Sequence, residues 1–181
     1  ACTVCSPTRA ALMTGKYPAR IHVTDWIPGH SPPYAKLRAP NWIKKLEKRH
    51  DTIAEVLGEM GYQTASVGKW HLMPAGDEDM DQYSPVSHGF DVNIGGNQWG
   101  LPGSYFHPYT HPTEGRGIGP LPPGGTENDY LTDRLASEAV RLIEDFGEDP
   151  FLLYVPFYSV HTPIQAKEIE GLSKLPTKKE L

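Results

Sequence analysis

The most reactive arrangement in the sequence is a cysteine placed just before an expected helix, with an arginine one turn later. Pro7 suits the first position of a helix, where its missing N–H costs nothing, and Ser6 is expected to be the N-cap. Arg9 follows Cys5 by four residues, so its side chain leans back over the turn that Cys5 precedes. Because the free N–H groups of a helix start attract anions, this stretch predicts an electropositive site around Cys5.

Two later stretches add cationic side chains at the ends of expected strands. In SVGKWHL, Lys69 and His71 stand two residues apart and share one side of an extended chain, whereas Trp70 points the other way, into packing. In YSVHTP, His161 follows an apolar strand. Each residue alone is more often inert, as a buried cysteine, a surface cation or a core histidine. Their combined spacing favours a pocket for an oxyanion ester, beyond the carboxyl ends of the strands.

The elements that position these residues follow a helix–strand, helix–strand pattern. The first pair is a helix over 51–61, with a capping box of Thr52 and Glu55, and a strand over 62–68. This helix is expected to bury an apolar face made of Ile53, Val56, Leu57 and Met60.

The second pair is a helix over 128–147 and an apolar strand over 150–158. Asn128 and Gly147 are the expected ends of the helix, and the strand is expected to be buried on both faces. The expected apolar stripe of the helix is Leu131, Leu135, Ala139, Leu142 and Ile143. Residues 73–125 show little periodicity, which is typical of a long functional loop. Together these elements predict an α/β fold with a largely parallel sheet.

Composition excludes several classes of protein. The 181 residues carry a net charge of −5, which gives no reason to expect nucleic-acid binding, and no apolar run reaches membrane-spanning length. The only two cysteines, Cys2 and Cys5, are too close together in sequence for a disulfide between them to stabilise the fold. The chain starts on Ala1 without a methionine and ends on the polar stretch LSKLPTKKEL, and we interpret it as a piece of a longer protein.

Three segments resemble those of the sulfatase family, in the same order. CSPTRAALMTG, from Cys5, resembles the first sulfatase signature, whose kernel is C-x-P-x-R, and GYQTASVGKWH, ending at His71, resembles the second. HTP at His161 resembles a third active-site histidine segment. The resemblance implies an α/β, alkaline-phosphatase-like sandwich with a largely parallel central sheet flanked by helices, incomplete in this chain. Residues 1–181 would then be a partial sulfatase catalytic domain.

The resemblance also implies a mechanism. Cys5 would be oxidised to formylglycine (3-oxoalanine), whose hydrate attacks sulfur with one hydroxyl and releases sulfate when the second loses its proton. Arg9 would hold the diol beside the metal, and Lys69 would contact the sulfate or the diol. His71 would accept the proton of the second hydroxyl. His161 would bind sulfate and help to protonate the leaving oxygen.

Further implications of the resemblance concern the metal, the partners and the compartment. The family uses a divalent cation, usually Ca²⁺, to which matured Cys5 would contribute an oxygen, while the other ligands lie in segments outside this chain. We therefore expect the isolated 181-residue chain to be inactive. The expected partners are a sulfated small molecule or carbohydrate and a maturation enzyme, either formylglycine-generating or anaerobic sulfatase-maturing. An exported location (periplasmic, extracellular or lysosomal) is expected.

Aromatic and polar side chains of two loops are candidates for the substrate rim, because such side chains suit sugar rings, although they could equally pack a loop without secondary structure. They are Asp25, Trp26, Asn97, Trp99, Tyr105, His107 and His111. A sulfated carbohydrate is the expected substrate. Two alternatives stay open at the level of sequence: a phosphoester or phosphonate-ester hydrolase of the same superfamily, and a non-catalytic relative.

Overall fold

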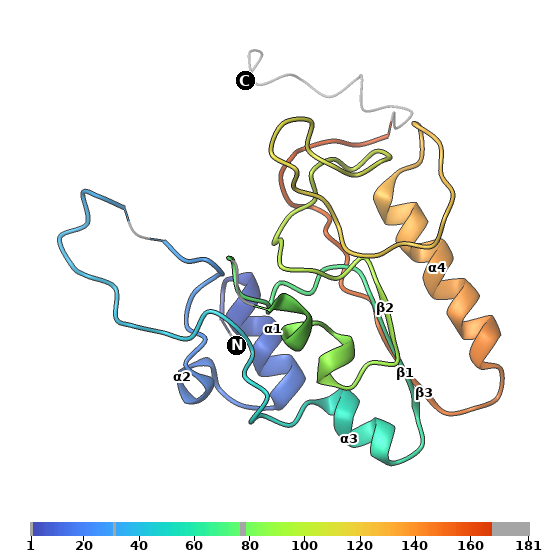
Figure 1. The fold of residues 1–181 in the computed structure, drawn as a ribbon, viewed down its shortest axis with the longest axis horizontal. Helices are drawn as coiled ribbons and strands as arrows, with labels where there is room; N and C mark the ends of the chain where they lie inside the picture. The colour runs from blue at the N-terminus through green and yellow to red at the C-terminus, as the bar shows by residue number, and fades with distance from the viewer. Residues whose placement is uncertain (1, 31, 77–78, 168–181) are drawn as a thin grey trace, which may run out of the picture.

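The protein is built on a three-stranded parallel sheet. The computed structural model describes residues 2–30, 32–76 and 79–167, so the polar end of the chain, 172–181, lies outside it. Strands β1 (Gln63–Val67), β2 (Val92–Ile94) and β3 (Phe151–Tyr154) lie in the order β2-β1-β3 (Figure 1). Both pairings are parallel, with Ala65 opposite Val92 and opposite Leu153. The predicted α/β class is confirmed, whereas β2 lies in the segment where the sequence predicted no element.

Helix α4 (Leu131–Phe146) covers one face of the sheet (Figure 1). Its apolar residues pack on Ala65 and Val67 of β1 and on Ile94 of β2. Gly147 ends the helix as predicted, but Tyr130, not Asn128, is the N-cap. Ile143 was placed in the buried stripe wrongly: it is 45% exposed, and Phe146 is buried instead.

The opposite face of the sheet is covered by α1 (Cys5–Thr14), α2 (Pro18–Ile21) and α3 (Ile53–Glu59), with the loops between them (Figure 1). The capping box of Thr52 and Glu55 at the start of α3 is confirmed. The apolar face expected for this helix is wrong, because Ala54 is its buried residue and Val56 is 49% exposed. Two short 3₁₀ turns, η1 (Met80–Tyr83) and η2 (Val86–His88), lead into β2.

Strand β3 shows why a continuous apolar run need not be fully buried. Its side chains alternate between the two cores, with Leu153 on the α4 face and Leu152 and Tyr154 on the α1 face. Nevertheless, Phe151 is exposed and the other three residues are half-buried, so burial on both faces is incomplete. The reason is that β3 is an edge strand, since no strand in the described part of the chain pairs with its outer side. None of the helices described is long and apolar enough to cross a membrane.

Candidate functional site

The site lies beyond the carboxyl ends of the three strands, where short hydrogen bonds hold the outgoing segments together. The amide of Gly68 donates to the carbonyl of Ile94 (2.7 Å), and the amide of Lys69 donates to the carbonyl of Pro156 (2.8 Å). Gly68 has φ +124°, and a Cβ there would lie 2.3 Å from the Pro156 oxygen. Only glycine therefore allows this approach, which brings Lys69 to the same edge as the segment that carries His161.

Cys5 is the first residue of α1 and opens onto a cavity of about 630 Å³. It is a free, half-buried thiol, as is Cys2. Val4 is the N-cap and supplies no side-chain cap, so no capping side chain occupies the N–H groups at this helix start. The sulfur atom thus lies beside backbone donors and open space, where an anionic group would fit.

Ser6 is not the N-cap that the sequence predicted. It lies inside the helix and is fully buried, and its hydroxyl donates to the carbonyl of His71 (3.0 Å) and accepts from the amide of Ile27 (3.1 Å). One side chain next to Cys5 therefore joins the helix start to the 25–28 loop and to the segment after β1.

Two cationic side chains, Arg9 and Lys69, lie next to Cys5. Nη1 of Arg9 donates to the carbonyl of Lys69 (2.7 Å) and to the hydroxyl of Tyr154 (3.2 Å). Lys69 is only 3% exposed. The net effect of its surroundings lowers the pKa of its ammonium to about 8: burial is the main cause, interaction with Cys5 opposes it, and the Arg9 charge adds to it. The two cations are held close together, which favours an anion between them and Cys5.

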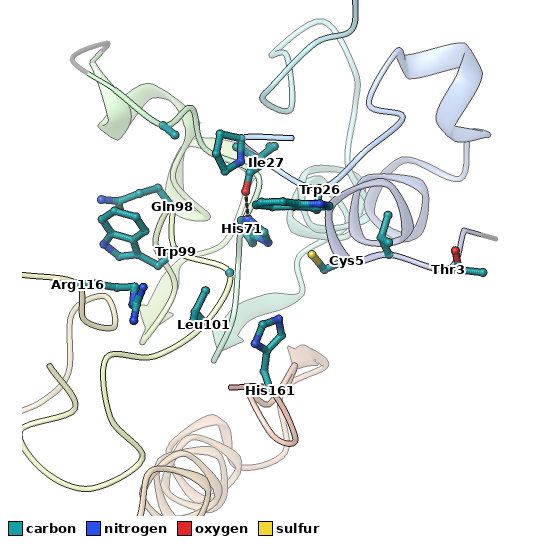
Figure 2. A pocket seen from close by; sticks show the side chains of 14 residues that line it. Thr3, Cys5, Trp26, Ile27, His71, Gln98, Trp99, Leu101, Arg116 and His161 are labelled. Carbon is teal, nitrogen blue, oxygen red and sulfur yellow. Dashed lines mark hydrogen bonds between the residues drawn. The ribbon is translucent and has the colours of Figure 1, made fainter. Parts of the chain in front are cut away.

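His71 is buried with its tautomer fixed by a neighbouring carbonyl. Its Nε2 lies 2.6 Å from the oxygen of Ile27, so Nε2 carries the hydrogen and Nδ1 keeps a lone pair (Figure 2). Nδ1 has no hydrogen-bond partner among the described residues. Burial lowers the pKa of His71 to about 4, more than the hydrogen bond to Ile27 raises it. At neutral pH the ring is therefore a neutral proton acceptor.

His161 reaches the same cavity from the segment after β3, facing Cys5 and His71 (Figure 2). It is exposed, and its amide donates to the hydroxyl of Tyr105 (3.1 Å) and to the carbonyl of Tyr158 (3.1 Å). Burial and the Lys69 charge lower its pKa. The structure thus brings together all five residues singled out for chemistry, although only Cys5, His71 and His161 line the main cavity.

Two of the seven candidate rim residues line the cavity, namely Trp26 and Trp99. Asp25 lies next to Trp26, and its carboxylate accepts from the amides of Trp26 (2.8 Å) and His30 (3.3 Å). The side chain of Asn97 bonds within the protein: Nδ2 donates to the carbonyl of Gly117 (3.1 Å), and Oδ1 accepts from the amide of Trp99 (2.9 Å). Its backbone carbonyl accepts from the His71 amide (2.9 Å).

The remaining three candidates, Tyr105, His107 and His111, do not line this cavity. Tyr105 is 1% exposed and belongs to the α4 core, where aromatic packing keeps it from the surface. His107 packs edge-on against Tyr109, and His111 accepts from the amides of its own turn, so neither lines the cavity. The sequence missed Gln98, Leu101 and Arg116, because the Gly-rich stretch that carries them has no periodicity from which to place them.

The residues described do not make a metal site on their own. A calcium ion takes six to eight oxygen ligands. Among the residues the structure describes, no group of three or more His, Cys, Asp or Glu side chains could hold a metal ion. The metal site stays a prediction.

Fold and site together define an α/β protein in which cationic side chains and two histidines gather around a cysteine at the carboxyl ends of parallel strands. The family model "Sulfatase" matches residues 1–170. The chain belongs to the sulfatase family, as the motifs predicted.

Similar proteins agree with this assignment. The chain is 34% identical to an arylsulfatase of Hemicentrotus pulcherrimus and 30% identical to arylsulfatase G of Mus musculus. These matches cover 89% and 91% of this chain, but only 29% and 33% of the relatives, so the chain spans about a third of their length. Among solved structures, "Ps i-CgsB in complex with k-i-k-neocarrahexaose" matches with a TM-score of 0.61 and 29% identity, over 90% of this chain and 36% of that one.

Proposed function

We propose that this chain carries part of the active site of a sulfuric ester hydrolase, with Cys5 as the residue that becomes the nucleophile. One observation carries the proposal: Cys5 shares a cavity with His71 and His161, and Arg9 and Lys69 lie beside it, in a chain of the sulfatase family. Since the chain spans about a third of its relatives, we propose that residues 1–181 are one portion of a larger catalytic domain.

Maturation of Cys5 to formylglycine is the first part of the proposal. The thiol is half-exposed at the edge of an open cavity, with room for an aldehyde hydrate in place of the sulfur atom. The matured residue supplies two hydroxyl groups, one to attack sulfur and one whose deprotonation releases sulfate. A formylglycine-generating or anaerobic maturing enzyme is the partner that this chemistry requires.

The remaining residues have roles that follow from their positions. Arg9 and Lys69 would neutralise the sulfate group, since a buried ammonium next to a guanidinium is stabilised by an anion. His71 would accept a proton at Nδ1, the nitrogen left free by the bond from Nε2 to Ile27. His161, at the exposed side, would contact the leaving-group oxygen.

The substrate is proposed to be a sulfated carbohydrate. Trp26 and Trp99 supply two aromatic side chains in the cavity that leads to Cys5. The similar Ps i-CgsB structure is a complex with neocarrahexaose, an oligosaccharide, which supports the same class of ligand. A divalent cation, Ca²⁺ by resemblance, and an exported location complete the proposal.

The test is sulfate release by the full-length gene product, expressed in a host that matures sulfatases. We expect the protein to hydrolyse sulfated oligosaccharides and a simple aryl sulfate, and a Cys5→Ala variant to lose this turnover. Aryl phosphate and phosphonate esters are the comparison substrates. Faster turnover of these than of the sulfate esters would assign a phosphoester hydrolase, and no turnover of either by a protein with matured Cys5 would assign a non-catalytic relative.

A further inference from the structure

A cation that the catalytic proposal does not use lines the far side of the cavity. Arg116 lies across the cavity from Cys5, next to Trp99 and Gln98 (Figure 2). Arg9 and Lys69, by contrast, lie beside Cys5. A single sulfate group at Cys5 is already matched by these two cations, so Arg116 is available for a different anion.

The backbone of Arg116 is held firmly, independently of its side chain. Its carbonyl accepts from the amide of His111 (2.6 Å), and it packs so closely on Gly103 that a Cβ there would lie 2.2 Å from the Arg116 oxygen. The guanidinium is thus presented to the cavity by a fixed turn. A change in the side chain leaves these backbone contacts in place.

The protein only partly satisfies the guanidinium. Nη1 pairs with Oε2 of Glu114 at 2.7 Å, with the side chains of Arg116 and Glu114 19% and 53% exposed. Nε of Arg116 is buried, with no acceptor among the residues described. An ion pair with such an exposed carboxylate is weak, so an anionic ligand group can compete with Glu114 for Arg116.

The size and walls of the cavity fit a ligand longer than one sulfated sugar. A volume of about 630 Å³ lies in the range of sites that enclose whole small molecules. Trp26 stands beside Cys5 and His71, and Trp99 stands beside Arg116 (Figure 2). Each end of the cavity therefore combines an aromatic ring with cationic or donor groups, a combination that suits an anionic sugar ring.

We infer that Arg116 forms a subsite for a second anionic group of the substrate, a sulfate or a carboxylate on the sugar next to the one that is cleaved. The inference rests on the proposed function and narrows its substrate class to saccharides with at least two negative charges. A neutral neighbouring sugar does not displace Glu114 from Arg116, so Arg116 adds nothing to the affinity for such a substrate.

The experiment compares three disaccharides that share one scissile sulfate: one with no other charge, one with a second sulfate and one with a carboxylate. In the full-length protein, we expect kcat/KM for a doubly charged disaccharide to exceed that for the singly charged one by about 10- to 100-fold, the range for a charge-assisted hydrogen bond. Whichever doubly charged sugar is preferred identifies the anion. The variant Arg116→Gln should bring the ratio of the two kcat/KM values close to one.

A second variant separates recognition from structure. Glu114→Gln removes the competitor, and we expect the preference for the doubly charged sugar to rise, by up to about fivefold for an exposed pair. If the ion pair only stabilises the turn, both variants lower kcat/KM for all three sugars by the same factor, and the inference is overturned. It is also overturned if Arg116→Gln leaves the ratio unchanged.

Calorimetric binding of the same disaccharides to the Cys5→Ala protein tests the subsite without turnover. Tighter binding of a doubly charged sugar that depends on Arg116 supports the subsite even if no sulfate ester is hydrolysed, an outcome that refutes the proposed function alone. Equal binding of all three sugars overturns the subsite while leaving sulfate hydrolysis intact.

Discussion

The substitution Ser6→Ala tests how the site is held together, because it removes a single hydroxyl that joins three segments. The Ser6 hydroxyl donates to the carbonyl of His71 (3.0 Å) and accepts from the amide of Ile27 (3.1 Å), and the residue is fully buried. Alanine leaves both backbone groups buried without this partner. Each orphaned group costs about 1–3 kcal/mol, and the better helix propensity of alanine returns about 0.5 kcal/mol. We expect a net loss of about 1.5–5.5 kcal/mol in the free energy of unfolding.

Ser137→Ala is the matched control. Ser137 is exposed on α4, and its hydroxyl donates only to the carbonyl of Asp133, one turn earlier in the same helix. We expect this change to alter the free energy of unfolding by less than about 0.5 kcal/mol. Urea unfolding of both variants, followed by tryptophan fluorescence, measures the difference. If Ser6→Ala costs no more than Ser137→Ala, the hydroxyl does not join the three segments and the reasoning is refuted.

Three further predictions concern other contacts around the sheet and the site. Gly68→Ala should lower the free energy of unfolding by about 3 kcal/mol or more, since its Cβ would lie 2.3 Å from a backbone oxygen. The control Gly147→Ala, at φ +61° with open space around the Cβ, should lower it by only about 1–2 kcal/mol. Equal urea midpoints for the two variants would contradict this. Gly100→Ala should lower kcat for an aryl sulfate by roughly 100-fold with folding retained, because its Cβ would lie 2.4 Å from the His71 ring and would displace that ring. An unchanged kcat would show that His71 takes no part in the mechanism. Burial lowers the pKa of His88 below 6.5 in the folded state, so the contribution of this residue to stability is present above pH 6.5 and is lost as the pH falls below that value. The variant His88→Gln should therefore show a smaller fall of the urea midpoint between pH 7 and 5. An equally steep fall in this variant would contradict the assignment.

Local rules in the sequence predicted much of the fold. The capping box of Thr52 and Glu55 placed α3, and Gly147, the expected end of the second helix, is the C-cap of α4. Periodicity failed where burial depends on distant partners. Val56 and Ile143 lie on regular apolar stripes, yet both are exposed, because no described segment packs against them. A stripe predicts an amphipathic helix but does not say how far the neighbouring layer extends.

The site could be predicted to a similar extent. Spacing within short motifs brought Cys5 and Arg9 together, and the position of His161 after an apolar strand, together with the family resemblance, added that residue. The role of Ser6 could not be predicted, because its partners His71 and Ile27 lie 65 and 21 residues away. Arg116 was missed for the same reason: loop closure, not local pattern, brings it to the cavity.

The central claim is that Cys5 is converted to an aldehyde and used against a sulfate ester. The most direct test is mass spectrometry of the Cys5 peptide, taken from protein produced in its native host. The account predicts a mass in which the thiol is replaced by an aldehyde, and a Cys2 that keeps its thiol. An unmodified Cys5 thiol, in a host that matures its other sulfatases, would contradict the account.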